Sequence, residues 1–110
     1  MKYAYQSEKL SAARHWLMLP HTQGIDASIA EAFAECTYAF HKMDENGLDD
    51  SARAWVARIK ELMDTTGIAD HAKEGTHRIK ARSLSMDQQI DLSRFVDELA
   101  HWFDRKFWEV

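Results

Sequence analysis

The sequence predicts an all-α fold, an antiparallel bundle of four main helices with a long connection between the third and the fourth, in one domain over residues 1–110. Two observations predict it. Apolar residues recur at intervals of three and four over four segments, which is the period of a helix buried on one side. Most of the four Gly and the single Pro fall between these segments, where helices end. A strand-like alternation occurs only weakly, over residues 77–83.

The first helix is predicted to run from Ser7, a suitable N-cap, to Leu19, where Pro20 closes it. The second is predicted from the cap residue Asp26 to Met43. Its apolar stripe consists of Ile29, Phe33, Cys36, Phe40 and Met43. A second stripe of Ala30, Ala34 and Tyr38 would let a neighbour approach closely, and a narrow strip with Ser28, Glu31, Glu35 and Lys42 stays polar.

The third helix is predicted from Asp49 to Thr66, with Gly67 as the residue that ends it. The fourth opens with Ser85-Met86-Asp87-Gln88, a capping box, and runs to Trp108. On a helical wheel its apolar arc consists of Leu92, Phe95, Val96, Leu99, Ala100, Trp102, Phe103 and Phe107. We expect this arc to face the core.

The connection over residues 68–84 is longer than most loops in compact domains. Residues 68–73 are expected to form a helical turn that Gly75 ends. Long ordered loops often carry function, and they also join helices at opposite ends of a bundle, so both interpretations stay open.

Composition narrows the class of protein. Cys36 is the only cysteine, which excludes an internal disulfide and a multi-thiolate zinc site and suits a reducing compartment. No segment has the apolar length of a signal peptide or a membrane span. The net charge of −4 does not favour a nucleic-acid partner. We therefore expect a cytoplasmic protein without a cofactor.

Two Glu-x-x-His sequences match the spacing of a carboxylate-bridged di-iron ligand pair. Glu74 and His77 enclose Gly75 in the poorly helical connection. Glu98 and His101 fall on the side of the last helix opposite its apolar arc, whereas metal sites in bundles are built from inward-facing side chains. A zinc site from Asp70, His71, Glu74 and His77 in the connection is a weaker candidate.

Arg94 and His101 lie two helical turns apart and share one side of the last helix. Their spacing resembles the Arg–His motif of HEPN-domain proteins. The resemblance implies a small helical protein, often dimeric, that cleaves RNA without metal through Arg94 and His101 meeting across the dimer. It covers eight residues, and Phe95 stands where the family usually has a polar residue.

Charge favours a different function. Residues 26–50 hold seven acids against one base, Lys42, whereas residues 71–82 are basic. This asymmetry predicts a non-catalytic protein that binds a basic protein partner through Glu31, Glu35, Asp49 and Asp50, as small acidic immunity and antitoxin proteins mask a nuclease.

Trp108 lies outside the apolar arc of the last helix, at an unusually aromatic end of the chain. A Trp in such a place folds over a neighbouring loop or contacts another chain. Together with the small-residue stripe of the second helix, it predicts a homodimer.

Overall fold

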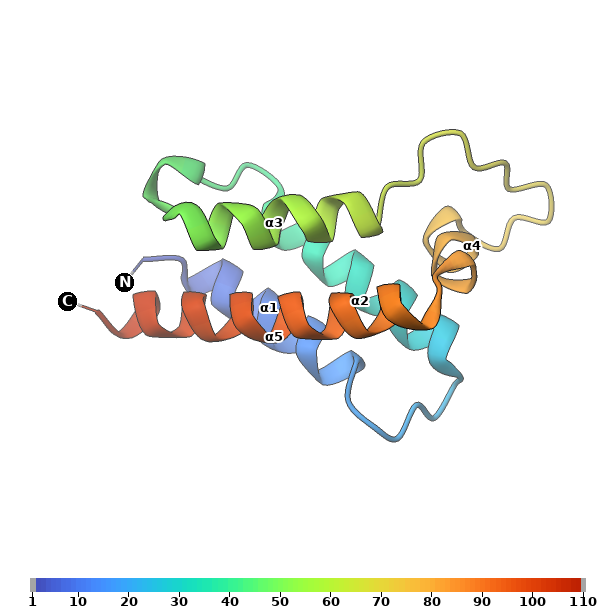
Figure 1. Cartoon of the computed structure of the whole chain (residues 1–110), viewed down its shortest axis with the longest axis horizontal. Coiled ribbons are helices and arrows are strands. Elements are labelled where there is room, and N and C mark those ends of the chain that lie inside the picture. The colour runs from blue at the N-terminus through green and yellow to red at the C-terminus, as the bar shows by residue number, and fades with distance from the viewer. Residues whose placement is uncertain (1, 110) are drawn as a thin grey trace.

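The computed structural model describes residues 2–109, so the predicted domain extends one residue further at each end. Five α-helices and one 3-10 turn form the described chain, which contains no strand, and the all-α prediction is confirmed (Figure 1). The elements are α1 (Ala4–Trp16), α2 (Ile25–Phe40), η1 (Glu45–Gly47), α3 (Asp50–Leu62), α4 (Thr76–Ser83) and α5 (Met86–Trp108).

The helices pack as a series of neighbours rather than as a closed ring. α1 contacts both α2 and α5, α3 packs mainly on α5, and α4 packs on α2. In Figure 1, α3 and α5 run side by side in opposite directions, and α2 crosses behind them. α5, the longest helix, is therefore the element on which both α1 and α3 are held.

The connection between α3 and α5 corrects one prediction, because about half of residues 68–84 is helical. Gly75, at φ 98°, precedes α4 instead of ending a turn. The Asp70 carboxylate accepts hydrogen bonds from the backbone N–H groups of Glu74 (2.8 Å) and Gly75 (2.7 Å) and so fixes the entry to α4. The buried Ala81 and the half-buried His77 lie four residues apart on the side of α4 turned inward.

Both of the first two helices begin earlier than predicted. α1 starts at Ala4 after Tyr3, a residue at φ 59°, and the predicted cap Ser7 is buried inside the helix. α2 follows Gly24, at φ 94°, so the predicted cap Asp26 lies in its first turn. There the Asp26 carboxylate suits the positive end of the helix dipole and pairs with Arg78 of α4.

The ends of the first three helices lie before the predicted ones, at Trp16, Phe40 and Leu62. Gly67 has the expected left-handed backbone, but it belongs to a separate turn in which the Ile68 N–H donates to the Thr65 carbonyl. Just after α3, the Asp64 carboxylate accepts a hydrogen bond from the backbone N–H of Thr66. This local hydrogen bond favours a turn over continuation of the helix.

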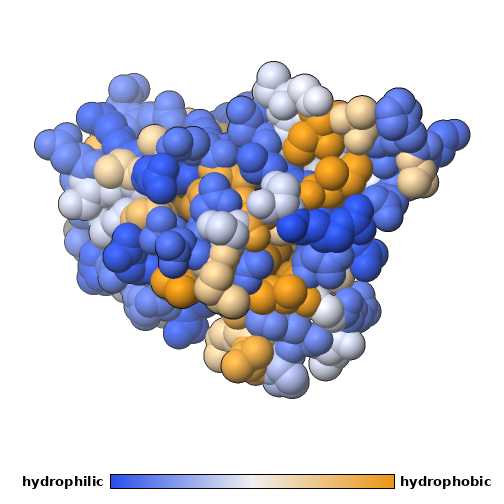
Figure 2. Space-filling model, turned by 45° about the vertical axis from the view of Figure 1, so that its right-hand side comes forward, coloured by the Kyte–Doolittle hydropathy of each residue, from blue (hydrophilic) through white to orange (hydrophobic). Residues whose placement is uncertain are grey.

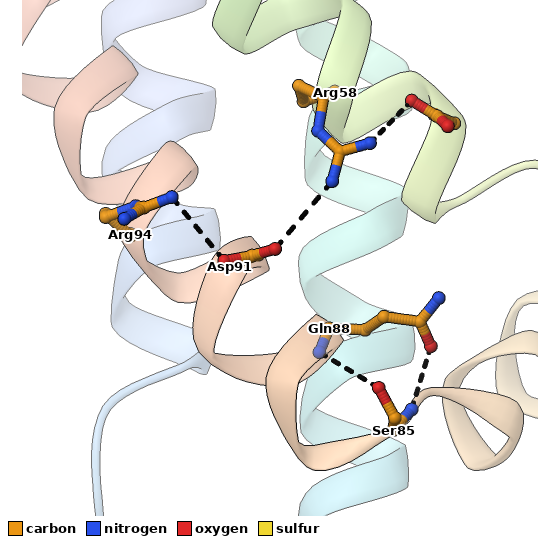
Figure 3. Close-up of polar contacts among 6 residues, drawn as sticks. Arg58, Ser85, Gln88, Asp91 and Arg94 are labelled. Atoms are coloured by element: carbon orange, nitrogen blue, oxygen red, sulfur yellow. Dashed lines mark hydrogen bonds and ion pairs between the residues drawn. The ribbon is translucent and has the colours of Figure 1, made fainter.

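The predicted start of α5 is confirmed in detail. The Gln88 N–H donates to Ser85 Oγ (3.1 Å), and the Ser85 N–H donates to Gln88 Oε1 (2.8 Å), as Figure 3 shows. The apolar arc faces the core as predicted: six of its eight members are buried, and Phe95 and Phe107 are half-buried.

One core cluster collects buried side chains from all five helices, with Phe33, Phe103 and Leu10 among its largest members. On α2 the predicted stripe is buried at Ile29, Phe33 and Cys36. Ser28, predicted to be polar surface, is also buried, because α2 is covered by α1 on one side and by α4 on another.

An aromatic cluster joins the two ends of the chain. The Tyr3 ring packs against Trp102 (5.8 Å between centroids) and Phe103 (5.2 Å). The Tyr3 hydroxyl donates to the Asp44 carbonyl (2.7 Å). Gly47 lies so close to this hydroxyl that a Cβ there would overlap it, so the turn before α3 needs a glycine for space and not for backbone conformation.

Asp49 holds α3 to α5. One carboxylate oxygen accepts from the Ala52 N–H (2.9 Å) and caps α3, and the other accepts from Trp102 Nε1–H (3.0 Å). These two hydrogen bonds, the Ala52 one first, keep the pKa of Asp49 below its ordinary value. Trp102 is 3 % exposed, so its indole N–H has no ready access to water as a substitute partner.

Over residues 2–109, none of the helices combines the length and the apolar character needed to cross a membrane.

Replacing Gly47 by Ala is expected to destabilise the fold by about 1–3 kcal/mol, because the new methyl group overlaps the Tyr3 hydroxyl. In the Tyr3→Phe background the nearest remaining atom is a ring carbon at 3.3 Å, so the same change should cost much less. Urea denaturation of the wild type, both single variants and the double variant measures this coupling. Equal costs of Gly47→Ala in both backgrounds would refute the close approach.

Asp49→Ala is expected to lower the melting temperature by several degrees, because it removes a helix cap and leaves the Trp102 N–H without an acceptor. Asp49→Asn keeps one acceptor oxygen, so it retains one of these two hydrogen bonds and should cost less than Asp49→Ala. Since the folded pKa of Asp49 is lowered, its charge stabilises the fold above the unfolded pKa, and this contribution is lost as pH falls through the folded pKa. Thermal melts between neutral pH and pH about 2 should therefore show a smaller acid-induced loss in Asp49→Asn than in the wild type.

Candidate functional site

Three shallow hollows follow one another from the first turns of α5 to the α1–α2 connection. One, of about 270 Å³, is lined by residues of α5 and by Ile25 at the start of α2. The second, of about 340 Å³, lies between α5 and the end of α1, and shares Ser93 with the first. The third, of about 290 Å³, follows the α1–α2 connection and shares Met18 with the second. Each hollow thus shares one lining residue with the next.

Large apolar side chains line these hollows. We name the set of Met18, Leu19, Ile25, Met86 and Ile90 the apolar surface, and all five side chains are exposed. Met86 is 70 % and Ile90 58 % exposed, although they stand one turn apart on a helix whose other side faces the core. Figure 2 shows one face of the molecule on which hydrophobic residues reach the surface between hydrophilic ones. Apolar groups gathered in this way mark interaction sites.

Arg94 and His101 lie on the exposed side of α5, and the structure does not bring them together. The Arg94 guanidinium lies over the Phe95 ring (5.0 Å) and 3.5 Å from Asp91, which also faces Arg58 (Figure 3). The side chain of Arg94 is 63 % exposed and that of His101 is 58 % exposed. Seven residues of helix separate them by about 10 Å along the axis, so within one chain they cannot share one reacting group.

Asp97 connects His101 to α1. His101 Nδ1 lies 2.9 Å from the Asp97 carbonyl, and the Asp97 carboxylate pairs with Arg14 at 2.5 Å. Asp97 therefore links α5 to α1 through an exposed ion pair beside the second hollow. Glu98 is exposed as well, so the Glu98-x-x-His101 sequence faces solvent as the helical wheel predicted.

The four acids predicted to bind a partner differ in their surroundings. Glu35 faces α1, with Oε2 buried and 3.7 Å from Lys9 Nζ. One carboxylate oxygen of Asp49 caps α3, and the other accepts from Trp102. Glu31 and Asp50 are exposed and have no ion-pair partner within residues 2–109. Only two of the four predicted acids are therefore free to bind a partner through their charge, fewer than the sequence indicated.

Other acids of the same segment are also neutralised in part. Asp26 pairs with Arg78 (3.3 Å), which together with the backbone keeps the pKa of Asp26 below its ordinary value, and Glu45 pairs with Lys60 (3.5 Å). Basic side chains of α4 and α3 therefore form ion pairs with the acidic segment.

Trp108 remains at the surface. It is 67 % exposed, and its ring packs edge-on against Phe107 at 5.0 Å between centroids. From the sequence, Trp108 was expected either to fold over a neighbouring loop or to contact another chain. Its exposure leaves the contact with another chain as the interpretation that stays a prediction.

The candidate zinc ligands serve other purposes. Asp70 caps the entry to α4, and Glu74 forms a close two-pronged ion pair with Arg82, which lowers the pKa of Glu74. His77 packs edge-on against Phe33, and its burial lowers its pKa. His71 is exposed. In the part of the chain that the structure describes, no three His, Cys, Asp or Glu side chains gather as metal ligands would.

Cys36 lies in the core with no exposed surface, and burial raises the pKa of its thiol to about 12. A thiol in this state is neutral at physiological pH, so Cys36 fills space in the core and does not act as a nucleophile.

The apolar surface was not found from the sequence. A signal was present, because Met86 and Ile90, four residues apart, fall on the polar side of the α5 wheel. Leu19 and Ile25, which flank Pro20 in the chain, belong to it only because the connection from α1 to α2 folds beside α5.

No protein-family model matches this chain, and neither a curated protein nor a solved structure is similar to it.

Proposed function

We propose that this protein is an antiparallel bundle of four main helices, α1, α2, α3 and α5, that acts without catalysis in the cytoplasm by binding another protein. The partner carries basic side chains, and Glu31 and Asp50 meet them. The comparison is with small acidic proteins that mask a nuclease, in charge and size.

The observation that carries a binding role is the number of large apolar side chains left at the surface of so small a chain. Beyond the apolar surface they include Tyr5, Tyr38 and Trp108. Exposed aromatic side chains supply much of the energy of protein interfaces, because they bury a large area and lose little conformational freedom.

The acidic contact is supported by the charges that remain uncommitted. Glu31 projects from α2, and Asp50 lies in the first turn of α3. Neither is needed to cap a helix or to hold a buried group, so their charges are available to a partner. Charge at the edge of an interface mainly speeds association and makes it sensitive to salt.

The double variant Glu31→Gln/Asp50→Asn is expected to weaken capture of the basic partner about tenfold, because it removes two charges without changing side-chain size. The measurement is affinity purification of the tagged protein from its native cells, with each co-purified protein quantified by mass spectrometry. Recovery of the partner from the wild type should also fall as salt rises.

Glu98→Gln/Asp104→Asn is the matched control, since it removes the same charge from exposed positions of α5. Partner recovery should be unchanged in it. Equal losses in both variants, or no loss in either, would overturn the assignment to Glu31 and Asp50. If no basic protein co-purifies with the wild type, the proposed function fails as a whole.

The alternative is a metal-independent ribonuclease of the HEPN type, favoured by the exposure of Arg94 and His101 on one side of α5. Under the main proposal, we expect the wild type to leave a labelled single-stranded RNA intact in the presence of EDTA. Cleavage that disappears in Arg94→Ala and His101→Ala but persists in Glu98→Gln would establish the alternative instead.

A further inference from the structure

We infer that two copies of this chain associate through the apolar surface, with the first turns of their α5 helices antiparallel across a two-fold axis near Ile90. This inference does not depend on the acidic contact of the proposed function, which uses Glu31 and Asp50.

The centre of this contact is apolar and linear. Met86, Ile90, Ser93 and Asp97 follow one another at intervals of four, three and four residues, so they form one line along α5 about 16 Å long. Met86 and Ile90 are exposed on this line, with Ile25 beside them in the same hollow. Ser93 is small and would let the backbone of another helix approach closely.

The charges beside this line select a second copy as the occupant. Asp87 and Arg94 flank it and are seven residues apart, so they lie on the same side of the helix. In an antiparallel pair crossing near Ile90, Asp87 of each copy faces Arg94 of the other. The symmetry therefore produces two ion pairs from one arrangement of opposite charges.

Both charges are available for such pairing. Asp87 is exposed and has no ion-pair partner within residues 2–109. Arg94 meets Asp91 only at 3.5 Å, the limit of a hydrogen bond, and is well exposed. Its guanidinium has five N–H donors, so a second carboxylate can be added without breaking the first contact.

The connection from α1 to α2 extends the surface beyond the helix. Leu19, 82 % exposed, and Met18 stand beside the hollows that continue from α5. An approaching copy of α5 would cover them together with Ile25. This gives the contact width as well as length, as an interface of standard size requires.

Sedimentation equilibrium over a range of protein concentrations tests the association. The wild type is expected to form dimers, and Ile90→Glu to weaken them at least about tenfold, because the two-fold axis would place two carboxylates together. Trp108→Ala is the comparison variant, because the sequence alone assigned self-association to Trp108; association through the apolar surface should leave the dimer unchanged in this variant. Circular dichroism checks that each variant keeps its helices.

A charge exchange identifies the occupant. Asp87→Lys and Arg94→Glu should each be monomeric, because each sets like charges against one another in both pairs. An equimolar mixture of these two variants should form a heterodimer, and the double variant Asp87→Lys/Arg94→Glu should again form a homodimer, since both arrangements restore opposite charges. Native mass spectrometry distinguishes these species.

Recovery of association in the mixture cannot arise from binding to a different protein or from loss of folding. A monomeric wild type at all concentrations would overturn the inference, and so would a dimer that is lost in Trp108→Ala and retained in Ile90→Glu. Failure of the mixture to associate would refute the antiparallel register. None of these outcomes affects the test of Glu31 and Asp50.

Discussion

The hydrogen bond from Trp102 to Asp49 fixes where the start of α3 docks on α5. α3 packs mainly on α5, and Asp49 joins the first turn of α3 to a buried indole of α5. The same carboxylate caps α3, so the start of the helix and its docking are fixed by one side chain. The Tyr3 ring also packs against Trp102 and brings the N-terminal part of the chain into the same cluster. Because Trp102 is buried, loss of the Asp49 carboxylate would leave a buried indole N–H without an acceptor.

Acidic side chains that serve the fold in this way are not available to bind a partner. The acidic segment from residue 26 to 50 is notable in the sequence, yet Asp49 is used for structure, and Asp26, Glu35 and Glu45 face cations of neighbouring helices. Exposed ion pairs contribute little stability, but they lower the charge that a partner would meet. A binding surface inferred from charge alone therefore shrinks to the positions that the fold leaves uncommitted.

What the sequence could predict is what depends on local pattern. The arc of α5 and its capping box follow from spacing along one continuous helix, and both are correct. The starts of α1 and α2 were missed because Tyr3 and Gly24 take positive φ values, which tertiary contacts and glycine stabilise without a side-chain cap. α4 was missed because it has eight residues and few apolar positions, and its helix is secured by Asp70 and by packing on α2. The apolar surface combines residues from three elements, which no local pattern can reveal.

Asp50 and the first turns of α5 lie at opposite ends of the molecule, and this follows from the antiparallel course of α3 and α5 in Figure 1. Asp50 starts α3, and Asp49 beside it is bonded to Trp102, so Asp50 lies near the C-terminal part of α5. Met86 begins α5, and sixteen residues of helix separate it from Trp102 by about 24 Å along the axis. A dimer formed through the first turns of α5 would therefore leave Asp50 of both copies uncovered. Each dimer would present two copies of Asp50, and a partner with two basic sites could bind both, which raises its apparent affinity without any new contact.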